Sequence, residues 1–264
     1  MKTRIISGAV MAAIVAAIFA VGFLWKTIVI SIAVSLLAAG AVFELIHNAA
    51  GIKNKTVVIG ASVFAALLVL IGHIGFVYGL FTVLVLYGIF AAVVILVYHK
   101  DFDMGKIAVT YALPVPFAFA FYLLDMTITT TNGLYYLLLL LVFSCVCDMG
   151  AYFTGVTIGK HKLCPEISPK KTVEGAVGGI VASLIFAVVI SLLFKKFSVG
   201  VMVATVPLCV LGMIGDLFAS AIKRSVGLKD YGNFIPGHGG IMDRVDSIIM
   251  IAPLMFILII LEVI

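Results

Sequence analysis

Long apolar runs constrain the fold of this chain more than any other feature of its sequence. Of its 264 residues, 64% are hydrophobic and only 11% are charged, whereas a soluble domain carries about 25% charged residues. Helices and closed barrels are the only structures that satisfy every backbone polar group inside a membrane. Because the runs are continuous and do not alternate between apolar and polar residues, we expect an all-α, polytopic integral membrane protein.

Windows of about 20 apolar residues, the length that crosses a bilayer as a helix, predict about nine transmembrane helices. They lie near residues 5–25, 27–49, 56–73, 78–98, 106–125, 132–153, 174–194, 199–221 and 241–263. Pro114 and Pro116 interrupt the fifth run, Pro207 the eighth and Pro253 the ninth. Each proline removes a helix hydrogen bond and can kink its helix. Two readings remain open: ordinary tolerance of proline in membrane helices, and a cleft that admits a lipid from the side.

The basic residues predict an orientation, because cytoplasmic loops of membrane proteins are enriched in Lys and Arg. With the N-terminus in the cytoplasm, nearly all basic residues fall on the cytoplasmic side, and only Lys26, Lys195 and Lys196 face outward. The two longest polar loops, 154–173 and 222–240, then lie in the cytoplasm, where they could bind a soluble substrate. The same bias explains the net charge of +5, so we expect no nucleic-acid partner.

The segment 216–246 is the densest polar stretch of the chain and holds four of its twelve carboxylates. Charge at a membrane boundary is costly and usually functional. Asp216, Ser220, Lys223 and Arg224 are spaced to share roughly one face of a helix. Asp243 and Asp246, three residues apart, share a face of the next helix.

Bringing these two helices together would place Asp216, Asp243 and Asp246 close to one another. Three unpaired carboxylates repel one another in a low dielectric and therefore need a cation. Oxygen ligands suit Mg²⁺, and a second cation of unknown identity stays open. The alternative is a set of salt bridges to three basic neighbours, Lys223, Arg224 and Arg244.

Basic and glycine residues beside these carboxylates can bind phosphate. Arg224 can hold a phosphate through two hydrogen bonds, and a lysine acts as a point charge. Gly239 and Gly240 precede the ninth run, where free N–H groups at a helix start attract anions. Two alternatives stay open here: Lys229 could serve only to set orientation, and His238 could be structural.

The loop 154–173 carries a similar set of groups before the seventh predicted helix. Lys171 and Thr172 offer a charge and a hydroxyl that could grip a nucleoside triphosphate. Thr172 could equally cap the helix, and both roles can hold together. Farther upstream, Glu44 and His47 are three residues apart near the end of the second run and could pair.

The segment 216–246 resembles the signature of the phosphatidate cytidylyltransferases, also called CDP-diacylglycerol synthases. The matching residues are Ser220, Lys223, Arg224, Lys229, Asp230, Gly232, Pro236, His238, Gly239, Gly240, Asp243, Arg244 and Asp246. Two further blocks are similar to S-P-x-K-T-x-E-G and D-x-x-A-Y-x-x-G of that family. They are formed by Ser168, Pro169, Lys171, Thr172, Glu174 and Gly175, and by Asp148, Ala151, Tyr152 and Gly155.

The resemblance implies an enzyme that makes CDP-diacylglycerol and pyrophosphate from phosphatidic acid and CTP in phospholipid biosynthesis. It implies a metal centre at Asp216, Asp243 and Asp246, with Lys223 and Arg224 completing the catalytic set. Asp148 and Glu44 would support this centre. The implied substrate-binding residues are Ser168, Lys171, Thr172, Glu174, Gly175, Ser220, Lys229, Asp230, His238, Gly239, Gly240 and Arg244.

The same resemblance suggests how the chain is organised. Residues 131–264 would form the catalytic membrane helices, with both long loops on the cytoplasmic side. Residues 1–130 would form a scaffold, a lipid cleft or a subunit interface, as in a homodimer, among membrane lipids. If the chain is bacterial, its expected location is the inner or plasma membrane.

Two other functions stay open. A CTP-dependent lipid kinase of the polyprenol type would release CDP instead of pyrophosphate. A cation-coupled transporter is disfavoured, because the charges gather at one face and no inverted repeat is visible.

Overall fold

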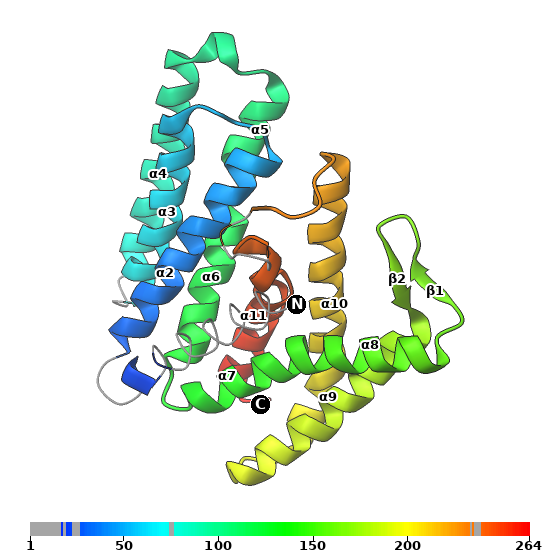
Figure 1. Cartoon of the computed structure of the whole chain (residues 1–264). Helices are drawn as coiled ribbons and strands as arrows, with labels where there is room; N and C mark the ends of the chain where they lie inside the picture. Colours follow the sequence, from blue (N-terminus) through cyan, green and yellow to red (C-terminus); the bar gives the residue numbers. More distant parts are fainter. Residues whose placement is uncertain (1–16, 18–19, 23–26, 74–76, 233, 235–238) are drawn as a thin grey trace. The chain divides into compact units, whose positions relative to one another are not determined.

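The computed structural model describes residues 17, 20–22, 27–73, 77–232, 234 and 239–264 (Figure 1). Most of the first predicted helix, and His238, lie outside these residues. The described chain is helical apart from turns, short connections and one two-stranded hairpin. Its elements are α2 (Ile28–Phe43), η1 (Glu44–Ala49), α3 (Lys55–His73), α4 (Val77–Val97), η2 (His99–Asp101), α5 (Met104–Ala112), α6 (Pro114–Ile128), α7 (Gly133–Leu141), η3 (Val142–Val146), α8 (Cys147–Ile158), β1 (Lys162–Cys164), β2 (Ser168–Thr172), α9 (Val173–Leu193), α10 (Val199–Ser225) and α11 (Met242–Ile260).

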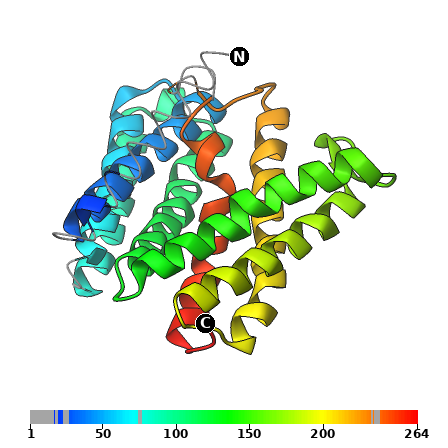
Figure 2. The ribbon, with the colours of Figure 1, turned by 60° about the horizontal axis from the view of Figure 1, so that its bottom comes forward.

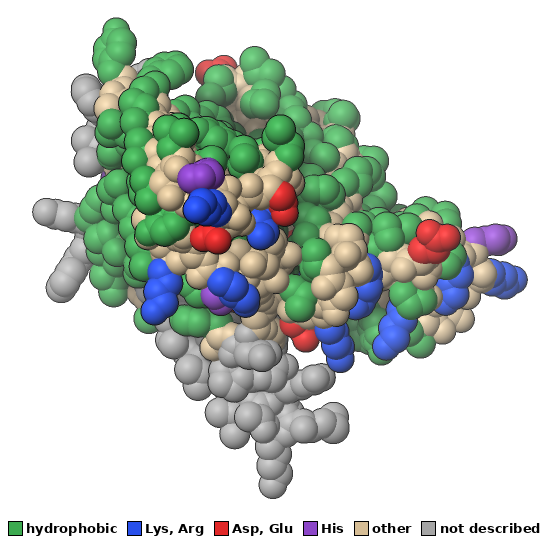
Figure 3. Space-filling model, turned by 90° about the horizontal axis from the view of Figure 1, so that it is seen from above, with side chains coloured by type: hydrophobic (Ala, Val, Ile, Leu, Met, Phe, Trp, Pro, Cys, Tyr) green, Lys and Arg blue, Asp and Glu red, His purple; other side chains and the backbone are tan. Residues whose placement is uncertain are grey.

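Helices long and apolar enough to cross a membrane dominate the structure. The described residues contain seven of them: Ile28–Ala49, Lys55–His73, Tyr78–Val97, Met104–Ile128, Gly133–Ile158, Val173–Leu193 and Val199–Ser225. Hydrophobic side chains form a large part of the surface visible in Figure 3, and many large apolar side chains are exposed, as expected for helices that face lipid. The structure therefore confirms an all-α, polytopic integral membrane protein.

The predicted count of nine helices is not confirmed. The first predicted helix falls mainly outside the described residues. The ninth corresponds to α11, which is a helix but is not among the seven apolar ones. Its first five residues include Asp243, Arg244 and Asp246, and these charges interrupt the apolar character that a spanning helix needs.

The proline-rich fifth run is broken as its sequence predicts. α5 ends at Ala112 and α6 begins at Pro114. Proline suits the first turn of a helix, where its missing N–H leaves no bond unmade. Pro207 and Pro253 instead lie inside α10 and α11.

The chain forms two compact units. Unit 1 comprises Met1–Thr129 and Val226–Arg244, and unit 2 comprises Thr130–Ser225 and Val245–Ile264. In unit 1, α2, α3 and α6 pack against one another, and α4 packs on α3. In unit 2, α8 and α9 run side by side, as Figures 1 and 2 both show, and α10 packs on α9.

Glycines bring α8 and α9 into close contact. A Cβ atom on Gly175 would lie 2.6 Å from the carbonyl oxygen of Ala151, and one on Gly179 would lie 2.5 Å from that of Cys147. Such distances are too short for any side chain, so these positions need glycine. Small residues at helix interfaces let the two backbones approach in this way.

The segment predicted as the loop 154–173 consists largely of regular secondary structure, so its description as a loop was wrong in detail. α8 continues to Ile158, and β1 then pairs with β2 as an antiparallel hairpin, with Lys162 opposite Thr172. The strands carry exposed lysines and bury only Thr172, so they lack the apolar alternation that predicts a strand. The predicted cap is confirmed, because the Thr172 hydroxyl accepts a hydrogen bond from the Gly175 N–H at 3.1 Å.

Candidate active site

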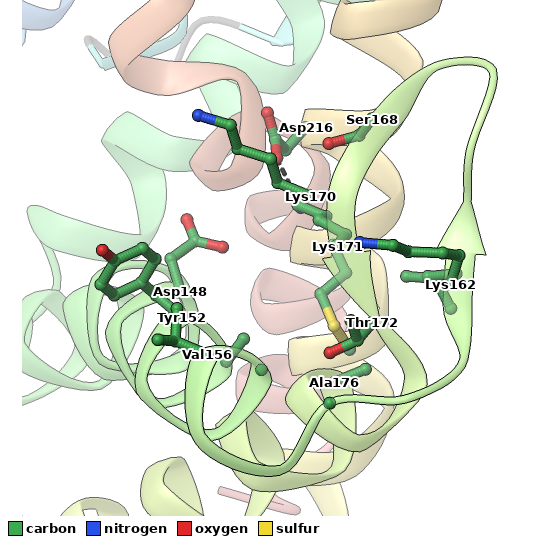
Figure 4. Close-up of a pocket in the computed structure, with 15 residues that line it drawn as sticks. Asp148, Tyr152, Val156, Lys162, Ser168, Lys170, Lys171, Thr172, Ala176 and Asp216 are labelled. Atoms are coloured by element: carbon green, nitrogen blue, oxygen red, sulfur yellow. Dashed lines mark ion pairs between the residues drawn. The ribbon is translucent and has the colours of Figure 1, made fainter.

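Unit 2 contains a pocket of about 600 Å³ between α8, the hairpin and α10 (Figure 4). Asp148 and Tyr152 line it from α8, while Lys170 and Lys171 line it from β2 and Asp216 from α10. Ser168 and Thr172 also line it, so five predicted site residues meet here. Pockets of this size bind small molecules and cofactors.

An ion pair crosses this pocket. Lys171 Nζ lies 2.5 Å from Asp216 Oδ2, with 23% and 30% of the two side chains exposed (Figure 4). Lys171 Nζ is itself buried and has no partner of hydrogen-bond geometry among the described residues. Since an ammonium has three donors, this one keeps capacity to bind an anion that enters the pocket.

Three carboxylates interact in unit 2. Asp246 interacts electrostatically with Asp216 and Asp148, and also with Lys223. Asp148 interacts in turn with Lys171 and Asp216. Sequence reasoning assigned Asp216 and Asp246 to the site but gave Asp148 only a supporting role. The sequence signal that could have placed Asp148 in the site is the D-x-x-A-Y-x-x-G block, which begins at Asp148 and ends on the pocket wall at Gly155.

Close packing of α10 on α11 brings Asp246 near Asp216. A Cβ atom on Gly215 would lie 2.6 Å from the carbonyl oxygen of Asp246. The helices can approach this closely only because residue 215 has no side chain. The glycine next to Asp216 therefore helps to determine the spacing of the two carboxylates.

In unit 1, Asp243 organises its own loop. Its Oδ2 atom accepts hydrogen bonds from the Tyr231 N–H at 2.8 Å and from the Gly240 N–H at 3.0 Å. Gly239 has φ +84°, a backbone conformation that side chains disfavour. These bonds hold the chain just before α11. The grouping of Asp243 with Asp216 and Asp246 stays a prediction.

Glu44 binds the beginning of α11. The Glu44 side chain is buried and accepts hydrogen bonds from the N–H groups of Ile241 and Met242, both at 2.9 Å. A helix N-terminus favours negative charge at such unpaired N–H groups. The expected pair with His47 is not formed: the His47 ring stacks on Phe43, with 5.2 Å between ring centroids.

Two signature glycines make room for this carboxylate. A Cβ atom on Gly232 would lie 2.6 Å from Glu44 Oε1, and one on Gly240 would overlap the carboxylate of Glu44. The glycines therefore serve the fold of unit 1 by leaving space for a buried carboxylate.

Glu174 ties the start of α9 to the chain that follows α8. Its carboxylate accepts hydrogen bonds from the backbone N–H groups of Lys160 at 3.0 Å and His161 at 3.1 Å. It also lies 2.5 Å from His161 Nδ1. Glu174 therefore anchors the hairpin that carries Lys171, and it does not line the pocket.

The remaining predicted residues do not line this pocket. Lys223 is buried and Arg224 is exposed in the last turn of α10, and Ser220 is half-buried one turn earlier. Three others are exposed in unit 1: Lys229, Asp230 and Arg244. Conversely, Lys162, Lys170 and Val156 line the pocket and were not assigned to the site. The cluster of lysines between residues 160 and 171 could have indicated two of these residues, Lys162 and Lys170, from the sequence.

The two carboxylates that line the pocket, Asp148 and Asp216, can supply only part of the ligands of a metal ion. Among the described residues, no three His, Cys, Asp or Glu side chains are close enough to hold a metal by themselves. Mg²⁺ is usually held by one or two carboxylates, with waters and substrate phosphates completing its shell. The carboxylates of Asp148 and Asp216, which line the pocket, have oxygen donors of the kind that such a site uses.

Comparisons with known proteins agree with the resemblance found in the sequence. A phosphatidate cytidylyltransferase of Staphylococcus haemolyticus is 44% identical over 135 residues, which is 50% of this chain and 52% of the relative. One of Bacillus subtilis is 45% identical over 128 residues, 48% of each chain. This chain thus spans about half the length of the curated relatives it matches. The model of the cytidylyltransferase family matches residues 2–261, nearly the whole chain. The chain therefore belongs to the cytidylyltransferase family.

Proposed function

We propose that this protein is a phosphatidate cytidylyltransferase, an enzyme that makes CDP-diacylglycerol from CTP and phosphatidic acid. The observation that most supports this function is the pocket where the Lys171 ammonium faces Asp216 and neighbouring carboxylates. The pocket lies in a chain whose relatives are named for this activity. A site for two polyanionic substrates needs positive charge and metal-binding oxygens in the same place.

The reaction is a nucleotidyl transfer. A phosphate oxygen of phosphatidic acid forms a bond to the α-phosphorus of CTP. The bond from that phosphorus to the oxygen bridging the α- and β-phosphates breaks, and pyrophosphate leaves with the electron pair. Because the attacking oxygen is already anionic, the protein needs no strong general base. Its main task is to hold two anions together and to neutralise charge on the leaving group.

The hairpin and α9 supply groups for this task. Lys171 can neutralise phosphate charge as a point cation. Thr172 uses its hydroxyl oxygen as the helix cap, so its hydroxyl proton stays available for donation. The pocket also offers the hydroxyl of Ser168. We assign the triphosphate of CTP to this wall of the pocket.

We further propose Mg²⁺ as the cofactor, held by one or two carboxylates from among Asp148, Asp216 and Asp246, with substrate phosphates and water completing its shell. Bound Mg²⁺ would supply charge neutralisation at the triphosphate. In the structure Lys171 is the cation paired with Asp216, which supports a site built to hold positive charge beside that carboxylate. A second cation, and a metal role for Asp243, are parts of the same proposal.

We propose that the protein lies in the plasma membrane and that its pocket opens toward the cytoplasm. The hairpin and its flanks carry Lys160, Lys162, Lys170 and Lys171, and such basic segments stay on the cytoplasmic side. CTP is soluble and would reach the site from there, whereas phosphatidic acid would arrive from the surrounding lipid. Exposed apolar helix faces provide the area that a homodimer would need.

The test uses the full chain in detergent with CTP, Mg²⁺ and phosphatidic acid. We expect pyrophosphate that appears only with phosphatidic acid, and a lipid product with the mass of CDP-diacylglycerol. Asp216→Asn should abolish both products in folded protein. CDP release from a supplied lipid alcohol would indicate the lipid kinase instead. A folded protein without either turnover would refute the proposal.

A further inference from the structure

The α8 wall of the pocket carries an aromatic ring to which the proposed reaction gives no role. Tyr152 is the only aromatic residue among the described residues that line the pocket. It follows Asp148 by four positions in α8, and such residues share a helix face with about 5–6 Å between their Cβ atoms. Figure 4 shows both side chains at the α8 side of the pocket, across from β2.

The opposite wall of the pocket carries positive charge. Lys162 lines it from β1, and Lys170 and Lys171 line it from β2. The two walls therefore differ in chemistry. The hairpin offers ammonium groups that attract anions, whereas α8 offers a flat ring one turn beyond a carboxylate.

A nucleoside triphosphate is divided in the same way, into a highly charged triphosphate and a flat, uncharged base. The triphosphate of CTP is assigned above to the hairpin wall. Asp148 interacts electrostatically with Lys171 and Asp216, so the charged part of the pocket extends to the turn of α8 just before Tyr152. A base attached to phosphates held there would lie near the next turn of the helix.

We propose that Tyr152 stacks on the cytosine ring of CTP and forms the base subsite of the pocket. This inference rests on the proposed function, because it takes CTP as the nucleotide. Tyrosine suits such a contact, since it offers a large rigid surface at a low cost in conformational entropy. Stacking on an aromatic side chain strengthens nucleotide binding by roughly 5- to 150-fold. It accepts any base, so the subsite contributes affinity for the nucleotide and does not select cytosine by itself.

The alternative is that Tyr152 contacts lipid, as aromatic rings on membrane helices often do. Its neighbour Phe153 allows the two roles to be separated. Each side chain is 66% exposed, and the two rings meet edge to face with 5.7 Å between their centroids. Only Tyr152 lines the pocket. Phe153 is therefore a matched control on the same helix, with the same exposed fraction and outside the pocket.

The experiment measures equilibrium binding of CTP and of inorganic tripolyphosphate to the full chain in detergent with Mg²⁺. Tyr152→Leu, which removes the ring, should weaken CTP binding by roughly 5- to 150-fold. Its affinity for tripolyphosphate should stay unchanged, because that ligand has no base. Tyr152→Phe keeps the ring and should bind CTP like the wild type, and so should Phe153→Leu.

Turnover gives a second readout. Stacking acts equally on bound CTP and on the transition state, so Tyr152→Leu should raise KM for CTP and leave kcat unchanged. The KM for phosphatidic acid should also stay unchanged.

Three outcomes would overturn the proposal. The first is a Tyr152→Leu chain that binds CTP like the wild type. The second is an equal loss of CTP and tripolyphosphate affinity, which would mean that the change disturbs the phosphate wall. The third is a raised KM for phosphatidic acid with unchanged CTP binding, which would make Tyr152 a lipid contact. If Tyr152→Leu does not fold, Tyr152→Met gives the same test.

The binding measurement also separates this proposal from the proposed function. It needs no lipid and no turnover, so it decides the role of Tyr152 even if the chain releases no pyrophosphate with phosphatidic acid. A chain that binds CTP through Tyr152 but turns over a different lipid would keep the base subsite and refute only the proposed function.

Discussion

Replacing Lys171 by Met tests the central feature of the pocket. The change removes the ammonium that lies 2.5 Å from Asp216 Oδ2 and keeps a side chain of similar length. At an effective dielectric of about 20, two charges at this distance attract by about 7 kcal/mol. Desolvation of both groups offsets most of this, and about a quarter of each side chain is exposed. We expect a net loss of stability of about 1–2 kcal/mol.

The expected effect on catalysis is larger. Removing one group that stabilises developing charge typically lowers the rate by about 10²–10³-fold, or roughly 3–4 kcal/mol. The assay is kcat/KM for CTP, measured by pyrophosphate release with phosphatidic acid present. Lys160→Gln is the matched control, because Lys160 is exposed on the same connection and does not line the pocket. We expect it to change kcat/KM by less than about threefold, since exposed charges are screened.

A double variant separates stability from activity. Lys171→Met leaves Asp216 without its cation, and Asp216→Asn leaves Lys171 without its anion, so each single change should destabilise the protein. The double variant leaves neither charge and should regain about 1–2 kcal/mol relative to the sum of the single changes. Its activity should stay as low as that of the single variants. Additive stabilities, or a Lys171→Met enzyme within about threefold of wild type, would refute the reasoning.

Three further predictions follow from other contacts. Asp246→Asn should fold normally but lose at least about 100-fold in pyrophosphate release; full activity would remove Asp246 from the site. Glu44→Gln should lower the free energy of unfolding by about 1–3 kcal/mol, because it weakens two hydrogen bonds at the start of α11, and the unfolding midpoint should fall accordingly. The exposed control Glu166→Gln should leave the midpoint unchanged. Gly175→Ala should destabilise the chain by about 1–3 kcal/mol, because its new Cβ would lie 2.6 Å from the Ala151 carbonyl oxygen; unchanged thermal unfolding would contradict this.

The membrane helices could be predicted because their signal is local. A run of about 20 apolar residues specifies a spanning helix through length and hydropathy alone, and the seven apolar helices of the structure all match predicted runs. The break at Pro114 and the cap at Thr172 were predictable for the same reason. Each depends on the backbone chemistry of one or two residues.

The hairpin and the role of Asp148 could not be predicted in this way. β1 and β2 carry exposed lysines, and their pairing is anchored by the Glu174 carboxylate, which lies outside both strands. Asp148 meets Asp216 only through the packing of distant helices. Periodicity in one segment contains no information about such contacts.

The acidic residues of the predicted site are of one chemical type but perform two different jobs. Glu44, Asp243 and Glu174 accept hydrogen bonds from two backbone N–H groups each, so their charge is already used by the fold. Asp148 and Asp216 instead line the pocket beside Lys171. Replacing a carboxylate of the first kind should lower the stability of the protein, whereas replacing one of the second kind should lower its turnover. Measuring both quantities for each carboxylate would therefore sort the signature residues more sharply than activity alone.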